Sequence, residues 1–159
     1  MTYSQKYALV HFISPIAYDT QFSMSDWPLH ITIADVFAVD RYEHDLDAKL
    51  QLLMTNSSPT TIRAIADGAL GVTSVTFLEV TPQLQQLHDA IVTLLEQNDA
   101  TFNHPEFTKK GFIPHSTIQD DSRLNVGDNI TLDTVSLVDM FPDDDWRQRK
   151  VIAHFSVST

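Results

Sequence analysis

The amino-acid sequence predicts an α+β fold in which helices pack on a mostly antiparallel sheet. Two segments place apolar residues at helical spacing, whereas the other apolar residues lie in short runs rich in β-branched side chains. Along the chain these segments follow the order strands, helix, strands, helix, strands. With 159 residues, the chain is long enough to bury a core, and we expect residues 1–159 to form a single two-lobed domain.

The first half of the chain alternates apolar runs with polar connections. The expected elements are strands at 6–14 and 30–37, a polar loop at 15–29 and a helix at 41–55. Asp40 is the expected helix N-cap, with Glu43 three residues later in a capping-box-like start. Tyr42 begins the apolar stripe of this helix, which continues through Leu46 and Leu50.

The second half repeats this alternation. The expected elements are strands at 60–66 and 74–80 around a turn at 67–71, a helix beginning at Thr81-Pro82, a loop at 98–111, a strand from His115, and strands at 130–141 and 149–157. Pro82 suits the first helical position because its missing N–H has no partner there in any case. The stripe of the helix is formed by Leu84, Leu87, Ile91, Leu94 and Leu95.

Composition excludes several classes of function. The net charge of −11 argues against an extended nucleic-acid groove, although a small phosphate ligand in a local pocket stays compatible with it. The sequence has no cysteine, which excludes disulfides, thiol catalysis and cysteine-bound zinc. No apolar run approaches the roughly 20 residues of a membrane span, and the N-terminus does not resemble a signal peptide. We expect a cytoplasmic monomer.

One tetrapeptide pattern occurs twice. Residues 27–33 are WPLHITI and residues 112–118 are FIPHSTI, so each half contains histidine, any residue, threonine and isoleucine, with a proline just before. Because side chains alternate along a strand, the histidine and threonine of each motif share one face, and the isoleucines face the core. If the halves are related by a pseudo-two-fold axis, two imidazoles and two hydroxyls meet in one pocket.

Such a pocket suits the hydrolysis of a phosphodiester. Imidazole titrates near neutrality, so one histidine can accept a proton from water while the other donates a proton to the leaving oxygen. The threonine hydroxyls can hydrogen-bond the non-bridging oxygens of the phosphate. This chemistry requires neither a metal nor another cofactor.

The repeated motif resembles the signature of the two-histidine (2H) phosphoesterase superfamily, which includes bacterial 2'-5' RNA ligase-like proteins and 2',3'-cyclic nucleotide phosphodiesterases. The lead-in GFIPHSTI and the stretch FLEVTPQLQQLHDAI are also similar to this family. The resemblance covers roughly residues 6–157. It implies a bilobal fold in which two antiparallel sheets line a central cleft with helices on the outside.

The resemblance also implies roles for four residues. His30 and His115 would be the acid–base pair, and Thr32 and Thr117 would bind the phosphate of a small nucleotide or an RNA end. Several relatives place a basic residue just after the second motif, where this chain has Gln119-Asp120-Asp121. The nearby cations Arg123, Lys109 and Lys110 are therefore open candidates for neutralising the phosphate.

Other residues leave alternatives open. His11 and His154, in the first and last strands, are candidates for the same cleft, whereas His88 and His44 are expected at the surface or its boundary and His104 in a loop. Trp27, Phe112 and Trp146 can stack on a base or pack around the cleft. Asp120-Asp121 and Asp143–Asp145 suit a divalent cation or a solvated turn. The alternative functions are a nucleotide- or phosphate-binding module without turnover and a metal-dependent hydrolase.

Overall fold

A computed structural model describes residues 5–39 and 44–157 of the chain. The strands are β1 (Lys6–Phe12), β2 (Gln21–Ser23), β3 (His30–Ala38), β4 (Thr60–Leu70), β5 (Thr73–Leu78), β6 (Thr101–Phe102), β7 (His115–Thr117), β8 (Asn129–Leu132), β9 (Thr134–Asp139) and β10 (Gln148–Ser156). The helices are α1 (His44–Thr55) and α2 (Pro82–Gln97), with short 3-10 turns at Pro105–Phe107, Lys109–Gly111 and Pro142–Asp144. None of the described helices is long and apolar enough to cross a membrane.

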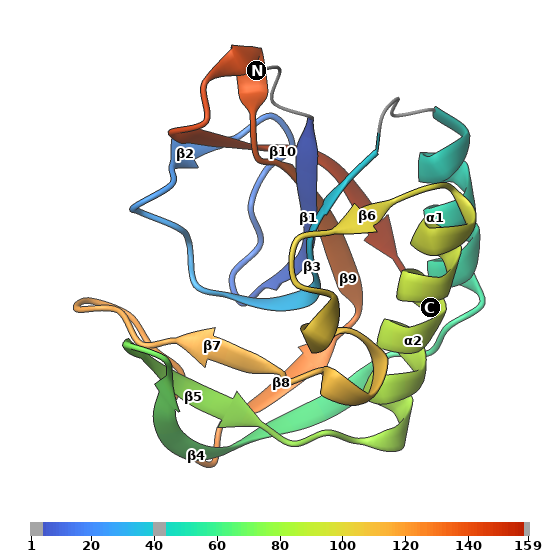
Figure 1. The fold of residues 1–159 in the computed structure, drawn as a ribbon. Helices are drawn as coiled ribbons and strands as arrows, with labels where there is room; N and C mark the ends of the chain where they lie inside the picture. Colours follow the sequence, from blue (N-terminus) through green and yellow to red (C-terminus); the bar gives the residue numbers. More distant parts are fainter. Residues whose placement is uncertain (1–4, 40–43, 158–159) are drawn as a thin grey trace.

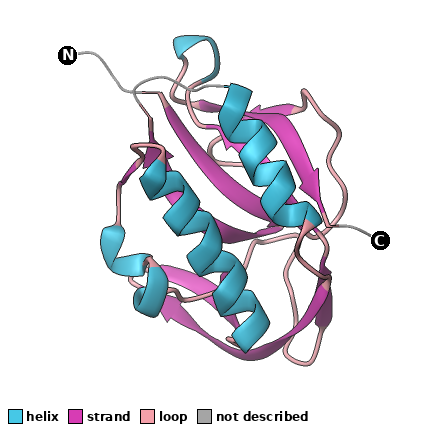
Figure 2. Ribbon diagram, turned by 90° about the vertical axis from the view of Figure 1, so that its right-hand side faces the viewer, coloured by secondary structure: helices cyan, strands magenta, loops and turns pink. Residues whose placement is uncertain are grey.

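The described strands form two sheets, one in each lobe (Figure 1). One sheet has the order β2-β10-β9-β1-β3-β6 and the other the order β7-β5-β4-β8, and the paired strands run antiparallel. Figure 2 shows α1 and α2 lying side by side across one side of the molecule. This is the predicted α+β arrangement with helices on the outside.

Strand β1 is buried on both faces, which explains its continuous apolar sequence. Tyr7 and Leu9 face the helices in the main core, whereas Val10 and Phe12 belong to a smaller apolar cluster on the opposite face. That second cluster includes Trp27 at its edge. The six-stranded sheet therefore presents an apolar floor on the side away from the helices.

The two predicted loops contain short strands that sequence periodicity does not reveal. Gln21–Ser23 pairs with β10, and Thr101–Phe102 pairs with the end of β3. Strands of two or three residues are too short to show an alternating pattern. Both strands lie at the edges of the six-stranded sheet.

The prediction of one strand over residues 130–141 is wrong, because this segment forms two strands that belong to different sheets. Strand β8 ends at Leu132 in the four-stranded sheet, and β9 begins at Thr134 in the six-stranded sheet. Asp133 alone connects them. Both strands are apolar and β-branched, so composition does not mark the change of sheet.

The hairpin of β4 and β5 is longer than predicted. Strand β4 continues through Asp67-Gly68 to Leu70, and the turn is centred on Gly71, whose φ of 59° favours glycine. A Cβ at residue 68 would lie 2.5 Å from the Phe77 side chain, which explains a glycine inside the strand.

Helix α2 begins as predicted. The Thr81 side chain accepts a hydrogen bond from the Leu84 N–H at 3.1 Å, and Pro82 occupies the first turn. The first described residue of α1 is His44. The capping residues predicted for that helix, Asp40 and Glu43, and the stripe residue Tyr42 lie outside the described residues.

Candidate functional site

The first motif lies at the start of β3, where His30 and Thr32 are half-buried and Ile31 and Ile33 are fully buried in the core. The alternation predicted from the sequence is therefore correct. The His30 ring packs against Trp27, with ring centroids 4.6 Å apart, and its Nδ1–H donates to the carbonyl oxygen of Pro28 at 2.8 Å.

The second motif forms β7, with His115 and Thr117 half-buried on one face and Ser116 buried on the other. The Nδ1–H of His115 donates to the carbonyl oxygen of Ile113 at 2.7 Å. Each catalytic candidate thus uses the same nitrogen to bond the carbonyl two residues before it. This fixes the tautomer and leaves Nε2 as the nitrogen available to a substrate.

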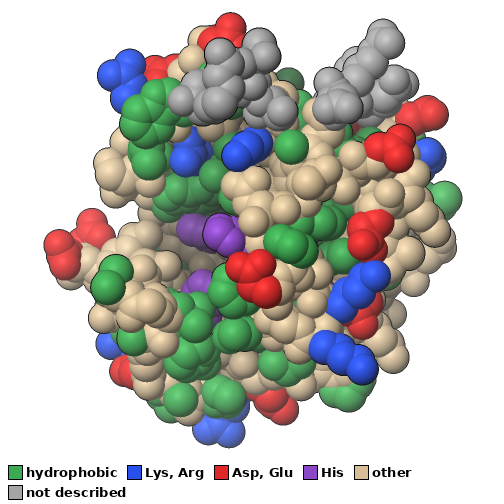
Figure 3. Space-filling view, in the orientation of Figure 1, with side chains coloured by type: hydrophobic (Ala, Val, Ile, Leu, Met, Phe, Trp, Pro, Cys, Tyr) green, Lys and Arg blue, Asp and Glu red, His purple; other side chains and the backbone are tan. Residues whose placement is uncertain are grey.

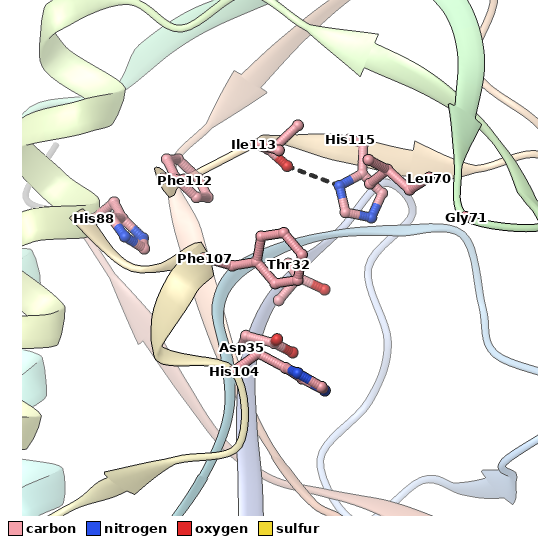
Figure 4. A pocket seen from close by; sticks show the side chains of 10 residues that line it. All are labelled: Thr32, Asp35, Leu70, Gly71, His88, His104, Phe107, Phe112, Ile113 and His115. Carbon is pink, nitrogen blue, oxygen red and sulfur yellow. Dashed lines mark hydrogen bonds between the residues drawn. The ribbon is translucent and has the colours of Figure 1, made fainter. Parts of the chain in front are cut away.

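The two motifs meet across the gap between the sheets, because β3 and β7 are in contact. One cavity of about 490 Å³ is lined by Thr32 and His115, and another of about 650 Å³ is lined by His30 and Thr117. The four motif side chains, predicted to meet in one pocket, are thus divided between two cavities, each with a histidine from one sheet and a threonine from the other. We call these two cavities together the cleft. Figure 3 shows histidine atoms in the hollow, and Figure 4 shows Thr32 and His115 coming from different strands.

The two histidines are close enough to affect each other electrostatically. Burial lowers the pKa of His30 below its ordinary value, and charge on His115 lowers it further, against the opposing effect of the Pro28 hydrogen bond. His30 therefore favours the neutral form near neutral pH. A neutral ring whose Nδ1 bears the proton presents Nε2 as an acceptor.

His88 is buried, with 1% of its surface exposed, so the prediction of a surface position is wrong. Its Nδ1–H donates to the carbonyl oxygen of Ile33 at 2.7 Å, and its Nε2 accepts the Lys109 N–H at 2.9 Å. The ring stacks on Phe112 with centroids 3.9 Å apart. Desolvation lowers its pKa, which matches a neutral ring with both nitrogens bonded. His88 therefore connects β3 next to Thr32 with the segment that precedes His115.

None of the three candidate cations lines the cleft. Lys109 forms an ion pair with Glu96 at 2.9 Å, and Arg123 forms one with Asp67 at 2.6 Å. Lys110 is exposed and does not line either cleft cavity. The lining residues of the two cleft cavities include Asp35, Asp26, Asp120 and Asp121 but, within the described chain, no Lys or Arg.

His11 and His154 do not join the cleft. They line a separate cavity of about 440 Å³ with Ser136 and Asp133. The Nδ1–H of His11 donates to the carbonyl oxygen of Thr134 at 2.7 Å, and Nδ1 of His154 shares a hydrogen bond of 2.7 Å with the Ser136 hydroxyl. His11 pairs with Ile31 in the neighbouring strand, yet it lines this separate cavity, which sequence position alone does not reveal.

Two further cleft residues were not singled out as site residues. Asp35 lines the cavity that contains Thr32 and His115. His104, from the predicted loop, lines the same cavity, and its Nδ1 lies 3.3 Å from Oε1 of Glu106. Asp35 lies five residues after His30 on strand β3. Its position on a strand that carries a motif was the signal that could have identified it. For His104 the sequence offers no comparable signal.

The remaining candidates are the aromatic residues near the motifs and the acidic residues that could hold a metal. Trp27 and Phe112 both line the cleft, Trp27 beside His30 and the largely buried Phe112 stacked on His88. Asp143–Asp145 lie in a 3-10 turn where Asp145 pairs with Arg147, as expected for a solvated turn. The described residues contain no group of three or more His, Asp or Glu side chains arranged to hold a metal.

Comparison with known proteins agrees with this geometry. Residues 8–147 match the family described as the 2'-5' RNA ligase superfamily. No curated protein matches the chain significantly.

Solved structures with the same fold include a phosphoesterase, with 13% identity, a TM-score of 0.61, and coverage of 99% of this chain and 100% of that one. They also include E. coli LigT with NADP+, with 13% identity, a TM-score of 0.58, and coverage of 99% and 100%. TT0787 of Thermus thermophilus has 14% identity, a TM-score of 0.61, and coverage of 95% and 97%. The family match over most of the chain confirms the resemblance that the repeated motif indicated: this chain belongs to the 2'-5' RNA ligase superfamily.

Proposed function

We propose that this protein is a metal-independent phosphoesterase that hydrolyses a 2',3'-cyclic phosphate, or a similar small phosphodiester, by acid–base catalysis with His30 and His115. The observation that carries the proposal is the crossed pairing in the cleft. Each cavity combines the histidine of one motif with the threonine of the other, so a phosphate between the sheets would have an imidazole on either side.

The two histidines take different roles in this proposal. His30 is the more buried, and its lowered pKa favours the neutral form, so its Nε2 accepts a proton from the attacking water. His115 is the side chain left to hold the proton that passes to the leaving oxygen. Water adds to phosphorus, the bond from phosphorus to one ribose oxygen breaks, and a phosphomonoester with a free hydroxyl results.

The threonines would bind the non-bridging oxygens of the phosphate. Both hydroxyls lie on the cleft face of their strands, two residues after each histidine. Hydroxyl donors placed in a partly desolvated site stabilise the charge that grows on these oxygens in the transition state. The proposal therefore assigns Thr32 and Thr117 to phosphate binding.

The relatives support a nucleotide as the substrate class. LigT from E. coli has been crystallised with NADP+, 3'-AMP, ATP and phosphate, each of which carries a phosphate group. A cyclic phosphate on a nucleoside is the member of this class that combined acid and base catalysis would open. Binding without turnover is the alternative outcome of the same experiment.

The test is hydrolysis of the four 2',3'-cyclic mononucleotides in the presence of EDTA. We expect turnover by the wild type and loss of most of it in His30→Ala and in His115→Ala. His154→Ala is the matched control, because that histidine lines a separate cavity and neither of the two cleft cavities. The rate should fall with decreasing pH below the ordinary histidine value of 6.5, as the buried His30 becomes protonated.

Each outcome has a clear meaning. Equal activity in wild type and His30→Ala would remove the acid–base assignment. Loss of activity in EDTA with rescue by a divalent metal would show that the reaction depends on a metal and would refute the metal-independent mechanism. Tight nucleotide binding without hydrolysis of any phosphodiester would make the protein a binding module.

A further inference from the structure

Strand β7, which carries the second motif, is a short strand at the edge of its sheet. It pairs with β5 and lies on the side of the four-stranded sheet that faces the other lobe (Figure 1). A strand of three residues has few backbone hydrogen bonds to hold it. The position of His115 and Thr117 against the six-stranded sheet therefore depends on the residues just before and just after the strand.

The segment before β7 is fastened to β3 by His88. As described above, this ring bonds both the Ile33 carbonyl oxygen and the Lys109 N–H. His88 lines the cavity that contains Thr32 and His115, so it serves that half of the cleft. The other half, which contains His30, needs a fastening of its own.

The segment after β7 is fastened by Gln119. Its side-chain Nε2 donates to the Trp27 carbonyl oxygen at 2.8 Å, and its Oε1 accepts the Ser122 hydroxyl at 2.8 Å. Its backbone N–H donates to the Ser122 carbonyl oxygen at 3.0 Å, which ties the residue to its own loop. Because Trp27 precedes β3 by three residues, the bond from Gln119 joins the two sheets at the cavity of His30 and Thr117.

Trp27 transmits this bond to His30 in two ways. Its ring packs on the His30 ring, with centroids 4.6 Å apart. Its carbonyl belongs to the residue before Pro28, whose own carbonyl oxygen accepts the Nδ1–H of His30. A shift of the Trp27 backbone would therefore move both the ring that covers His30 and the carbonyl that fixes its tautomer.

The chemistry of Gln119 suits a supporting role. An amide donates and accepts hydrogen bonds at once but is neither an acid nor a base near neutral pH. Gln119 is half-buried, and both polar atoms of its side chain bond protein groups. It also follows Thr117 by two residues, so it connects the threonine of one motif with the histidine of the other.

We propose that Gln119 is a positioning residue, which joins the two sheets beside His30 and holds the His30 ring against Trp27 in one cavity with Thr117. It acts through the Trp27 carbonyl and not on the substrate. This inference rests on the proposed function for the reaction that His30 serves.

Loss of this hydrogen bond should admit water to the His30 ring. Burial is the main cause of the lowered pKa of His30, while the Pro28 hydrogen bond opposes it and charge on His115 adds to it. With less burial, the pKa of His30 should rise toward the ordinary value of 6.5.

Other charges near the ring should change this shift little. The charged side chains that line the His30 cavity or face the Trp27 ring are Asp26, Asp120, Asp121 and Arg149. The three carboxylates are exposed, so solvent and salt screen them both with and without the Gln119 bond. The Arg149 guanidinium carbon lies 6.0 Å from the centre of the Trp27 ring, with that ring between it and His30.

The test replaces Gln119 by methionine, which has a similar length and can form neither side-chain bond. Because a small misplacement of a catalytic group can cost about 100-fold in rate, kcat for the 2',3'-cyclic mononucleotides should fall by about 10–100-fold. KM should rise by less than about threefold, since Gln119 does not bind the substrate. The pH below which the rate falls should move upward toward 6.5.

Two spectroscopic readouts follow the site without substrate. Proton NMR titration of the His30 ring, assigned with His30→Ala, should give a higher pKa in Gln119→Met than in the wild type. The sequence has two tryptophans, so in a Trp146→Phe background the fluorescence of Trp27 is observed alone. Its emission should shift to longer wavelength in Gln119→Met as the indole becomes more exposed.

Two further variants make the comparison specific. Gln86→Met is the matched control, because Gln86 is exposed on α2 and lines neither cleft cavity, and it should keep the wild-type values. Ser122→Ala keeps the bond from Gln119 to Trp27 but removes the hydroxyl that orients the amide. It should shift every readout in the same direction by a smaller amount.

An unchanged kcat and pH profile in Gln119→Met would overturn the positioning role, and so would a lower kcat with no change in the pKa of His30. If the wild type hydrolyses none of the cyclic phosphates, the proposed function fails and the NMR titration decides the role of Gln119 separately. A His30 pKa that rises in Gln119→Met but not in Gln86→Met supports it, and equal pKa values overturn it. If Gln119→Met does not fold, the same titration of Ser122→Ala gives the decision.

Discussion

Replacing His88 by phenylalanine should destabilise the protein strongly while keeping an aromatic ring at the same place. His88 is fully buried, and its two nitrogens bond the Ile33 carbonyl oxygen and the Lys109 N–H. Phenylalanine preserves the stack on Phe112 but offers neither bond. The substitution therefore isolates the contribution of the two hydrogen bonds.

The magnitude follows from the two groups that lose their partner. A buried donor or acceptor left unsatisfied costs about 1–3 kcal/mol, so the loss of both should lower the free energy of unfolding by about 2–6 kcal/mol. His88→Gln is the matched variant, because one amide group reaches one of the two partners. It should lose about half as much.

Urea unfolding at neutral pH measures both variants. The midpoint should fall while the slope against urea stays constant, since the surface exposed on unfolding is nearly unchanged. A loss below about 1 kcal/mol in His88→Phe would show that these hydrogen bonds add little beyond the packing of a ring. A smaller loss in His88→Phe than in His88→Gln would contradict the reasoning equally.

The pH dependence provides an independent check of the same residue. Burial lowers the pKa of His88 in the folded protein below the ordinary value of 6.5 that holds in the unfolded chain. The stability contributed by the neutral ring is therefore complete above pH 6.5 and is lost as the pH falls from 6.5 toward the lower folded-state pKa. Below pH 6.5 the wild type should lose stability more steeply than His88→Phe, and parallel curves would refute the assignment.

Three further predictions concern the motifs and the segment before the second one. Thr32→Val and Thr117→Val should each lower kcat/KM by about 10–100-fold, because each removes a hydrogen bond to a charged phosphate, with exposed Thr61→Val as the control. Ser116→Ala should keep turnover and raise the free energy of unfolding by up to about 1 kcal/mol in urea unfolding, because its Oγ is buried without a partner in the described chain. Gly111→Ala should lower the melting temperature and the turnover rate together, because its Cβ would collide with the Glu106 backbone oxygen and force a backbone shift ahead of His115; unchanged values would contradict this.

The motif strands could be predicted from the sequence because the alternation of side chains along a strand is a local rule. Alternation assigned His30 and Thr32 to one face and the isoleucines to the core, and the structure bears this out. Helix α2 was equally clear, since its cap and its apolar stripe are both local features. The same stripe contains the signal for His88, which follows Leu84 by four residues and so falls on the buried face.

The features that were missed depend on contacts between distant segments. The change of sheet at Asp133 has no local marker, because the residues on both sides are equally suited to strands. One cavity of about 470 Å³ brings together Lys6, Asn103 and Trp146, which lie far apart in the sequence. Periodicity within a window of residues cannot bring such positions together.

The single-residue step at Asp133 has a mechanical consequence. Its carbonyl oxygen accepts the Val157 N–H at 3.0 Å, and the next carbonyl oxygen, that of Thr134, accepts the Nδ1–H of His11. A connection that is one residue long and clamped on both sides leaves almost no backbone dihedrals free to act as a hinge. The two lobes therefore have little freedom to hinge at this corner. If the cleft hydrolyses a phosphodiester as proposed, selection among substrates would depend on which molecules fit the cleft without a change in the angle at this corner.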